Sequence, residues 1–394
     1  MIAEEIYLAG AVRTPIGRFG GALAAVPSPQ LAAAAAREAL RRAALDSAGI
    51  DETILGCARQ AGVGPNPARQ ASRLAGVPDD VPAYTVNQAC ASGLKTILLA
   101  GRAIAGGEAG TILAGGMENM SRVPYLLSTA RHGARMGHQE LTDAMFRDGF
   151  MDPLSGMLMG ETAENLAREY GISREEQDQY AAESQRRCQA SRERGVFSEE
   201  IVPIDLPDAR QPGKNLAADE HPRDGVTAAS LASLPPVFGK NGTITAGSAS
   251  GITDGAAAVV VSRDRPNLSR GPVCRLVDWT SVGVAPERMG IGPVPAIRRL
   301  LQKTGLALEQ IDLVEINEAF AAQVLACQRE LRIDPQRLNP NGGAIALGHP
   351  IGCSGARIVV TLMHEMARRR ARYGIAALCV SGGLGVAALL QSIG

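Results

Sequence analysis

The 394-residue sequence is poor in aromatic side chains and has no excess of charge of either sign. Phe, Trp and Tyr together make up 3% of the chain, and 40 basic residues balance 40 acidic ones. Nucleic-acid-binding proteins usually combine a basic surface with aromatic side chains on which bases stack, so this composition argues against that class. The apolar content of 45% excludes a mainly disordered chain and suits two or three domains, or one duplicated architecture.

Long hydrophobic runs are missing as well. No segment approaches the ~18 consecutive apolar residues of a membrane span. Residues 1–5 contain acids where a signal or transit peptide would have bases, and residues 391–394 match no retention or peroxisomal signal. We therefore expect a cytoplasmic protein that binds neither membranes nor nucleic acid.

The cysteines do not form closely spaced pairs. Seven of them are scattered along the chain without a CxxC pattern, which excludes a zinc knuckle. Their odd number and the length of the chain argue against a disulfide scaffold. Each cysteine is therefore a small core residue or a reactive thiol.

The strongest positive signal is an internal repeat. Two distant segments have the same order of parts: an element with Cys, Ser and Gly, then a helix, a strand and a glycine doublet. In the first segment these parts lie at residues 87–93, 94–104, 111–114 and 115–116. In the second they lie at residues 348–355, 356–370, 375–380 and 382–383. Two similar halves that alternate strand and helix predict a layered α/β architecture.

Further elements fit this scheme. Residues 6–11 and 311–316 read as strands, and residues 30–45 and 295–304 read as helices. The helix at 356–370 has an amphipathic pattern, which predicts that His364 lies on its polar face.

The segment between the halves, about residues 121–250, differs from them in composition and pattern. Ser173 and Glu176 form a capping-box pattern before a charged helix that Gly195 ends, and residues 205–225 read as irregular loop. A long insertion in an α/β protein often covers a binding site. The alternative, a surface excursion without a ligand role, stays open at this stage.

Two cysteines are candidates for chemistry. Cys90 stands at the N-terminal end of a helix that is apolar on most sides, where free N–H groups and the helix dipole stabilise a thiolate. Cys379 ends a strand and enters the glycine turn at residues 381–385, whose N–H groups can stabilise an oxyanion. Taken alone, either thiol can equally be a packed core residue.

One histidine and one asparagine complete the candidates. His349 lies in the glycine-dense stretch 341–352, which we expect to be too irregular for a helix and where an imidazole can act as a base. Asn317 follows a predicted strand. Taken alone, His349 can be structural and Asn317 can be a helix N-cap.

The combination of the four residues favours chemistry over packing. Ligands of α/β sheets gather beyond the carboxyl ends of the strands, where all four are expected. Two thiols and one imidazole suit carbon–carbon bond chemistry on a thioester, in which one thiolate takes the acyl group and the other moves a proton at the α-carbon. A thiol hydrolase needs only one cysteine.

The sequence resembles the thiolase family, which contains acetyl-CoA acetyltransferases and 3-ketoacyl-CoA thiolases, over essentially its whole length. The motifs that carry the resemblance are residues 12–17 (VRTPIG), 87–93 (NQACASG), 115–121 (GGMENMS), 245–257 (TAGSASGITDGAA), 317–320 (NEAF), 339–357 (NPNGGAIALGHPIGCSGAR) and 379–385 (CVSGGLG). Their number and order make the resemblance specific.

The resemblance implies a thiolase fold, with two similar βαβαβαββ halves in a layered α–β–α–β–α core. It implies an N-terminal half at residues 1–270, with the loop domain inserted at about 121–250, and a C-terminal half at 271–394. It also implies coenzyme A and acetyl-CoA as substrates, no permanently bound cofactor, no metal, and a homo-oligomer. The oligomer is a dimer or a tetramer, in which residues 125–150 with Arg131 and Arg135 mediate association.

The resemblance also assigns roles to single residues. Cys90 is the acylated nucleophile, His349 its activating base, and Cys379 the acid or base at the substrate α-carbon. His349 and a water held by Asn317 form one oxyanion hole, and the N–H groups of Cys90 and Ser381 form the second. The residues that it implies for coenzyme A and thioester binding are Arg223, Ala246, Ala249, Ser250 and Phe320.

Two departures from the family pattern affect these expectations. Family members usually have glycine where Ser381 stands, and a positive φ there would strain a serine. Acetoacetyl-specific members have His-Met-Gly where this chain reads Leu158-Met159-Gly160. The exchange leaves room for longer or different acyl groups. The alternatives to acetyl transfer are therefore a degradative thiolase of broader chain length, a non-catalytic acyl-CoA-binding or lipid-binding member of the fold, and a condensing enzyme for carrier-protein thioesters.

Overall fold

The computed structural model describes residues 4–207, 213–266 and 269–393, so Met1, Gly394 and part of the predicted loop at 205–225 lie outside it. Ten strands within these ranges form one continuous sheet. Nine of them follow one another in the order β12 (Leu313–Ile316), β13 (Tyr373–Val380), β14 (Leu384–Ser392), β11 (Cys274–Gly283), β1 (Tyr7–Arg13), β10 (Thr253–Ser262), β5 (Thr111–Asn119), β3 (Glu52–Gly56) and β4 (Ala83–Val86). The tenth, β2 (Gly17–Arg18), pairs with β10.

The sheet consists of two halves that meet at a narrow joint. Strands β1 and β11 pair only through Tyr7 with Arg275 and Leu8 with Cys274. The first half contains β1, β3, β4, β5 and β10, and the second contains β11 to β14. These halves are the two α/β units that the repeat predicts.

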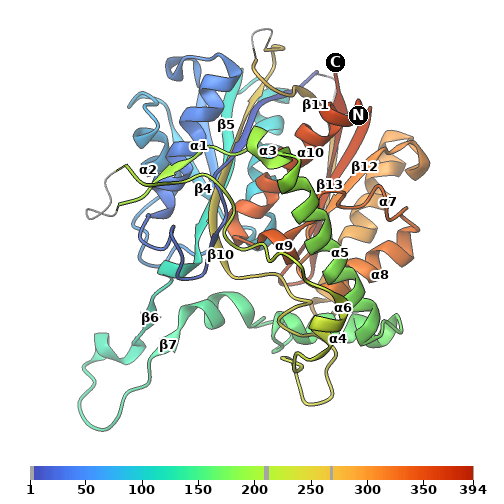
Figure 1. The fold of residues 1–394 in the computed structure, drawn as a ribbon. Helices are drawn as coiled ribbons and strands as arrows, with labels where there is room; N and C mark the ends of the chain where they lie inside the picture. Colours follow the sequence, from blue (N-terminus) through green and yellow to red (C-terminus); the bar gives the residue numbers. More distant parts are fainter. Residues whose placement is uncertain (1–3, 208–212, 267–268, 394) are drawn as a thin grey trace.

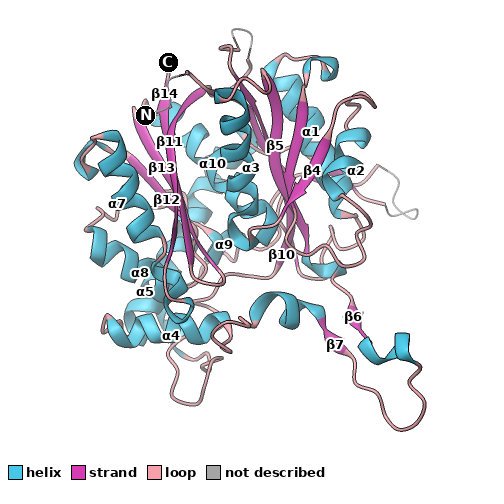
Figure 2. Cartoon of the chain, turned by 180° about the vertical axis from the view of Figure 1, so that it is seen from behind, coloured by secondary structure: helices cyan, strands magenta, loops and turns pink. Residues whose placement is uncertain are grey.

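Helices fill the space between the two half-sheets and cover their outer faces (Figure 1, Figure 2). The central layer contains α3 (Ser92–Ala105) and α10 (Ile351–Arg369). The outer layers contain α1 (Ser28–Ala43) and α2 (Pro67–Leu74) on one side, and α7 (Pro293–Thr304) and α8 (Ala321–Leu331) on the other. The predicted α–β–α–β–α layering is therefore confirmed.

The two central helices cross closely at their N-terminal ends because three glycines lie there. A Cβ on Gly93 would lie 2.7 Å from the backbone N of Ala356. A Cβ on Gly352 would lie within 3 Å of the main chain of Cys57 and Ala58, and one on Gly355 would collide with the main chain of Leu94. The crossing brings the segments before the two helices together, and these segments contain Cys90 and His349.

Local sequence signals set several element ends as expected. Ser173 and Glu176 form the capping box of α5 (Arg174–Glu193), with both reciprocal hydrogen bonds. Gly195 follows this helix with φ +72°. The helix α7 ends at Gly305, which adopts the left-handed conformation with φ +70°.

The central helix α10 differs from the sequence-based expectation in two ways. It begins at Ile351, five residues earlier than predicted, and the stretch before it contains a short helix, α9 (Ala344–Leu347). His364 is buried, with 6% exposed, and its Nε2 lies 3.0 Å from the carbonyl oxygen of Ala11. The amphipathic pattern gave the wrong prediction for His364 because sheet halves cover both sides of α10. Polar residues of this helix therefore form hydrogen bonds with groups inside the protein.

The insertion forms a separate cover below the two half-sheets. It contains α4 (Met159–Glu169), α5 and α6 (Ala228–Ala232), and α5 packs on α8 and α9. An arm built on β6 (Tyr125–Leu126) and β7 (Thr142–Asp143) extends away from the body (Figure 1). Its tip exposes large apolar side chains, including Met136 at 93%.

No helix in the described ranges combines the length and the apolar content that crossing a membrane requires.

Candidate active site

A cavity of about 750 Å³ lies where the two halves and the insertion meet. Of the nine residues that the sequence predicts for catalysis or coenzyme A binding, the cavity wall includes Cys90, His349, Cys379, Arg223, Ala246, Ala249, Ser250 and Phe320. Asn317 lies behind the wall, with its Nδ2 3.4 Å from Nε2 of His349. The structure thus brings all nine together from segments that are far apart in the chain.

Cys90 lies in a tight turn at the start of the central helix α3. The turn, η2 (Ala89–Ala91), is fixed by hydrogen bonds from the Gln88 N–H to the Ser92 hydroxyl and from that hydroxyl to the Ala89 carbonyl. Ala89 has φ +44°, a conformation that is uncommon for alanine. This turn presents the Cys90 side chain to the cavity.

The surroundings of Cys90 act on its thiol in opposite directions. Burial in the cavity wall raises its pKa, while the charge of Arg59 and the backbone N–H groups of Ser381 and of Cys90 itself lower it. The net shift is upward, so the resting group is a thiol that needs a base. The N–H groups that lower the pKa are the pair that the sequence assigned to an oxyanion hole.

His349 has the protonation state of such a base. The Ser354 hydroxyl donates to the Pro350 carbonyl at 2.9 Å, so it accepts from Nδ1 of His349, 2.5 Å away. The proton is therefore on Nδ1, and the lone pair of Nε2 remains available. Burial, together with the charges of Arg357 and Arg59, lowers the pKa of His349 to about 3, so the ring is neutral at pH 7.

Asn317 follows β12 and lies against the imidazole. Its backbone N–H donates to the carbonyl of Ala377 in the neighbouring strand β13. The side-chain Oδ1 is buried and accepts no hydrogen bond from the described residues. The amide of Asn317 thus contacts Nε2 of His349 through its Nδ2, and its Oδ1 remains available as a hydrogen-bond acceptor beside the ring.

Cys379 comes from the opposite half-sheet. It is the second-last residue of β13, where it pairs with Gly385 of β14. Burial, followed by the negative charge that Cys90 acquires as a thiolate, raises the pKa of Cys379 well above its usual value. The two thiols are therefore close enough to influence each other's ionisation.

The glycine turn after β13 accommodates serine without strain. The residues of this turn with positive φ are Gly382, at +82°, and Gly383, at +80°. Ser381 is not in the left-handed region, so the strain that the sequence led us to expect there does not arise. Its N–H reaches Cys90 as a glycine N–H would.

The other five cysteines do not line the cavity, and all of them are buried: Cys57, Cys188, Cys274, Cys327 and Cys353. Burial raises the pKa of each, to about 12 for Cys274, Cys327 and Cys353. They are packed core thiols.

Several wall residues were not predicted from the sequence. The insertion contributes Phe146, Gly149, Phe150 and Phe238, which shows that it covers the site and is not a mere surface excursion. Leu158, noted above as a departure from the family pattern, also lines the cavity. Most of these residues lie outside the family motifs. The one signal for them in the sequence was the expectation that the insertion covers a site.

Arg59 is the most important residue that the sequence analysis missed. It follows the carboxyl end of β3, the same kind of position that identified the other candidates. Its segment, residues 57–66, lies outside the motifs that carry the family resemblance.

Metal binding was considered as well. In the part of the chain that the structure describes, no group of three His, Cys, Asp or Glu side chains is arranged to hold a metal ion.

Comparisons with known proteins agree with this geometry. Residues 6–265 match the family model "Thiolase, N-terminal domain", and residues 270–392 match "Thiolase, C-terminal domain". An acetyl-CoA acetyltransferase of Pseudomonas aeruginosa is 51% identical over 98% of this chain and 99% of its own length. An acetyl-CoA acetyltransferase of Escherichia coli is 49% identical over 99% of this chain and 100% of its own length.

Solved structures give the same result. The acetyl-CoA acetyltransferase of Bacillus anthracis has a TM-score of 0.95 with 44% identity, over 99% of both chains. Human mitochondrial 3-ketoacyl-CoA thiolase in complex with CoA has a TM-score of 0.94 with 39% identity, over 99% of this chain and 98% of its own.

Proposed function

Because the chain belongs to the thiolase family, we propose that it joins two acetyl-CoA molecules into acetoacetyl-CoA and free CoA, and also catalyses the reverse cleavage. The chain is an acyltransferase that acts on CoA thioesters, without a permanently bound cofactor. The observation that carries the proposal is the meeting of two thiols and a neutral imidazole in one cavity.

In the first half of the reaction, Nε2 of His349 takes the proton of the Cys90 thiol. The thiolate attacks the carbonyl carbon of acetyl-CoA, and the N–H groups of Cys90 and Ser381 donate to the oxygen that becomes negative. The carbon–sulfur bond to CoA breaks, the CoA sulfur takes the proton from His349, and the acetyl group stays on Cys90.

In the second half, the thiolate of Cys379 removes an α-proton from another acetyl-CoA. A water on Asn317 donates to the enolate oxygen, while the free Nε2 of neutral His349 can accept from that water, and the enolate carbon attacks the acetyl group on Cys90. Acetoacetyl-CoA leaves, and the α-proton passes from Cys379 to the Cys90 sulfur. Cleavage runs through the same steps in reverse.

The coupling between the two thiols supports this order of events. The charge of a Cys90 thiolate raises the pKa of Cys379. An acetylated Cys90 cannot ionise, so this repulsion is absent at the step that needs the Cys379 thiolate. The first half-reaction thereby prepares the base of the second.

The proposal is tested by incubating the protein with acetyl-CoA and locating the added acetyl group by peptide mass spectrometry. We expect acetylation of Cys90 and its loss in Cys90→Ser. Acetylation of Cys57 or Cys353 would reject the assignment. Cys379→Ala should still acetylate Cys90 but should not exchange the α-protons of acetyl-CoA with deuterium from the solvent, and unimpaired exchange would refute its role.

A broader preference for acyl groups is a second candidate function. Leu158 and the aromatic residues Phe146 and Phe150 line the cavity, so part of the wall is apolar and lacks the histidine of acetoacetyl-specific members. Measuring kcat/KM for thiolysis of 3-ketoacyl-CoA substrates of increasing length distinguishes the two. A steep fall beyond four carbons would exclude the broader function.

We also propose a cytoplasmic homo-oligomer, a dimer or a tetramer, with the boundary between its halves at residue 270. The exposed apolar side chains of the arm support association, because Tyr125, Met136 and Leu141 are more than half exposed in the single chain. Light scattering on the intact protein and on a variant with a shortened arm tests the assembly. A monomeric intact protein would refute it.

A further inference from the structure

Arg59 is a buried cation in the wall of the cavity that contains Cys90. The mechanism above assigns no step to it. Only 8% of the residue is exposed, yet it lines the cavity that contains Cys90. Its charge acts on Cys90 and on His349, but it is not among the groups that affect Cys379. The guanidinium therefore lies within electrostatic reach of the nucleophile and its base.

The guanidinium has no partner in the described part of the protein. Its Nε is buried without a hydrogen-bond acceptor, and no carboxylate of the described residues lies within 4 Å of it. Glu118 is a nearby opposite charge, but its oxygens accept from the backbone N–H groups of Ala58, Arg59 and Gly352, at 3.1, 3.0 and 2.8 Å. A guanidinium in a residue that is only 8% exposed is rarely left unpaired, since little water reaches its donors.

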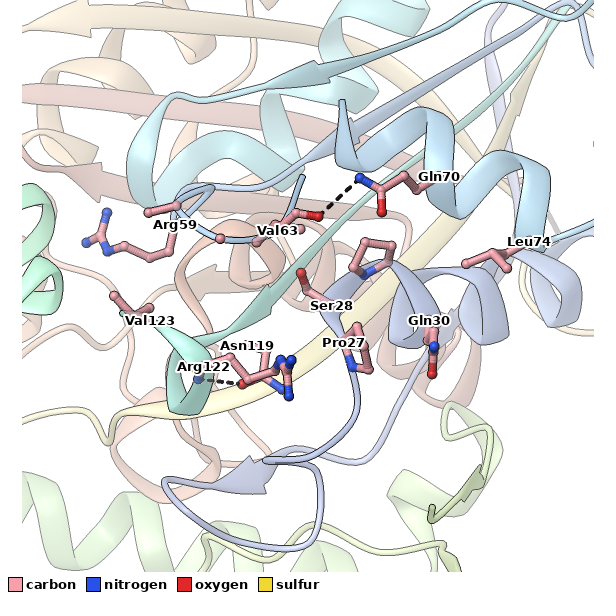
Figure 3. Close-up of a pocket in the computed structure, with 13 residues that line it drawn as sticks. Pro27, Ser28, Gln30, Arg59, Val63, Gln70, Leu74, Asn119, Arg122 and Val123 are labelled. Carbon is pink, nitrogen blue, oxygen red and sulfur yellow. Dashed lines mark hydrogen bonds between the residues drawn. The ribbon is translucent and has the colours of Figure 1, made fainter. Parts of the chain in front are cut away.

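The direction of the side chain points to the catalytic cavity. A Cβ on Gly149 would collide with Nη2 of Arg59, so the guanidinium lies against the segment Phe146–Phe150 of the cavity wall. Residue Arg59 also borders a neighbouring cavity of about 310 Å³. Figure 3 shows its guanidinium pointing away from Gln70 and Leu74 of that neighbouring cavity.

The rest of the wall would strengthen the attraction of an anion. No Asp or Glu is among the described residues that line the catalytic cavity. The other two arginines of the wall, Arg18 and Arg223, are exposed, so they lie toward solvent. Met120, Phe150 and Ile351 make the interior beside Cys90 apolar, which reduces screening of the Arg59 charge.

We propose that Arg59 binds a carboxylate at the far end of the acyl group carried by Cys90, so that the preferred substrates are CoA thioesters of dicarboxylic acids. The inference rests on the second candidate function, the broader preference for acyl groups, and deepens it. In thiolysis, Cys90 attacks the 3-keto carbon of a 3-oxo-ω-carboxyacyl-CoA, and the bond between C2 and C3 breaks. The electron pair forms the enolate of acetyl-CoA, which takes a proton from Cys379. The acyl group on Cys90, with its carboxylate on Arg59, then passes to the sulfur of free CoA.

A competing role for Arg59 predicts a different pattern. If the guanidinium only stabilises the Cys90 thiolate, its removal slows acyl transfer equally for all substrates. If it also binds a distal carboxylate, its removal slows the substrates that carry one far more than those that do not. A pair of substrates of equal length therefore separates the two roles.

The experiment compares thiolysis of 3-oxoadipyl-CoA, which ends in a carboxylate, with that of uncharged 3-oxohexanoyl-CoA. We expect the wild type to prefer the carboxylated substrate in kcat/KM. Arg59→Met should lower kcat/KM for that substrate by about 100-fold, the effect of losing a charge-assisted, water-excluded pair. The value for the uncharged substrate should fall much less, because that substrate loses only the effect of the Arg59 charge on Cys90 and His349. For the carboxylated substrate, Arg59→Lys should lie between the wild type and Arg59→Met, because lysine keeps the charge but not the bidentate geometry.

Two controls keep the result interpretable. Arg122→Met makes the same chemical change at the neighbouring cavity, outside the catalytic one, and should leave both substrates unaffected. Thermal unfolding should show Arg59→Met folded, since the change removes an unpaired buried charge.

Equal losses for both substrates, or a wild-type preference for the uncharged one, would overturn the inference. Acetylation of Cys90 by acetyl-CoA in the wild type tests the proposed function separately. If Cys90 is acetylated but no carboxylate preference depends on Arg59, only the role of Arg59 fails.

Discussion

The starts of the two central helices occupy equivalent places in the two halves, yet they present different side chains to the cavity. Helix α3 begins at Ser92 and α10 at Ile351, so Cys90 and His349 each stand two residues before the first helical residue. The sequence repeat instead pairs Cys90 with Cys353, which lies inside α10 and is 1% exposed. One half therefore supplies the proposed nucleophile and the other supplies the proposed base from the same structural position.

This comparison teaches that the point where a helix begins decides which residue is reactive. Cys90 lies in a turn ahead of its helix and borders a cavity. Cys353, in a closely similar sequence context, is packed within the helix, and burial raises its pKa to about 12. A displacement of a few residues separates a catalytic thiol from a structural one.

Replacing Cys90 and Cys353 in turn should give the largest difference, although the sequence repeat makes the two cysteines look equivalent. Cys90→Ala removes the proposed acyl acceptor, and kcat should fall by about 10⁴-fold or more. Cys353→Ala should keep kcat within about threefold and cost ~1 kcal/mol of stability through the small cavity that it leaves. Steady-state thiolysis and urea unfolding measure these effects, and comparable losses of activity in both variants would contradict the assignment.

The two buried histidines of the second half provide the next largest contrast. His349→Asn should slow the acylation of Cys90 by about 10²- to 10⁴-fold, since it removes the base. His364→Asn should leave the acylation rate nearly unchanged and lower the melting temperature, because its hydrogen bond goes to the Ala11 carbonyl. Single-turnover CoA release reports the rates. A slow His364→Asn variant with an unchanged melting temperature would show that the roles are not divided in this way.

The pH dependence of stability sharpens the same contrast. The pKa of His349 is lowered to about 3 in the folded chain, whereas an unfolded histidine titrates near its usual value of about 6.5. Between these values the unfolded state binds more protons, so the free energy of unfolding falls as pH decreases from about 6.5 toward 3. His349→Asn should reduce this slope in urea unfolding at pH 4 to 7, and an unchanged slope would mean that the ring is already protonated.

The smallest effect is expected at the glycine turn. Ser381→Gly should change kcat by less than about twofold, because Ser381 is outside the left-handed region. Gly382→Ala introduces a side chain at φ +82° and should cost ~1 kcal/mol of stability and slow acylation, as the turn that carries the Ser381 N–H shifts. Equal behaviour of the two variants in unfolding and in CoA release would refute this account of the turn.

Much of the fold and most of the site could be predicted from the sequence, because their signals are local. Glycine at position 305 and the Ser173–Glu176 pair mark helix ends through their own geometry. Cys90, Asn317 and Cys379 follow or end strands, so α/β topology alone brings them near one another. The family motifs then indicated their roles.

What the sequence did not reveal depends on contacts between distant segments. His364 belongs to a helix with an amphipathic pattern, but sheet halves lie on both of its sides. The start of α10 at Ile351 depends on its crossing with α3, which residues near 93 control. Arg59 has no motif around it, and only the fold shows that the insertion closes over its guanidinium.

The close crossing at Gly93, Gly352 and Gly355 has a consequence for how activity arises. The proposed nucleophile belongs to one half of the duplicated chain and the proposed base to the other, and they come together where missing side chains let main chains approach each other. Neither half alone contains both residues. Turnover therefore depends on how the two halves dock within one chain.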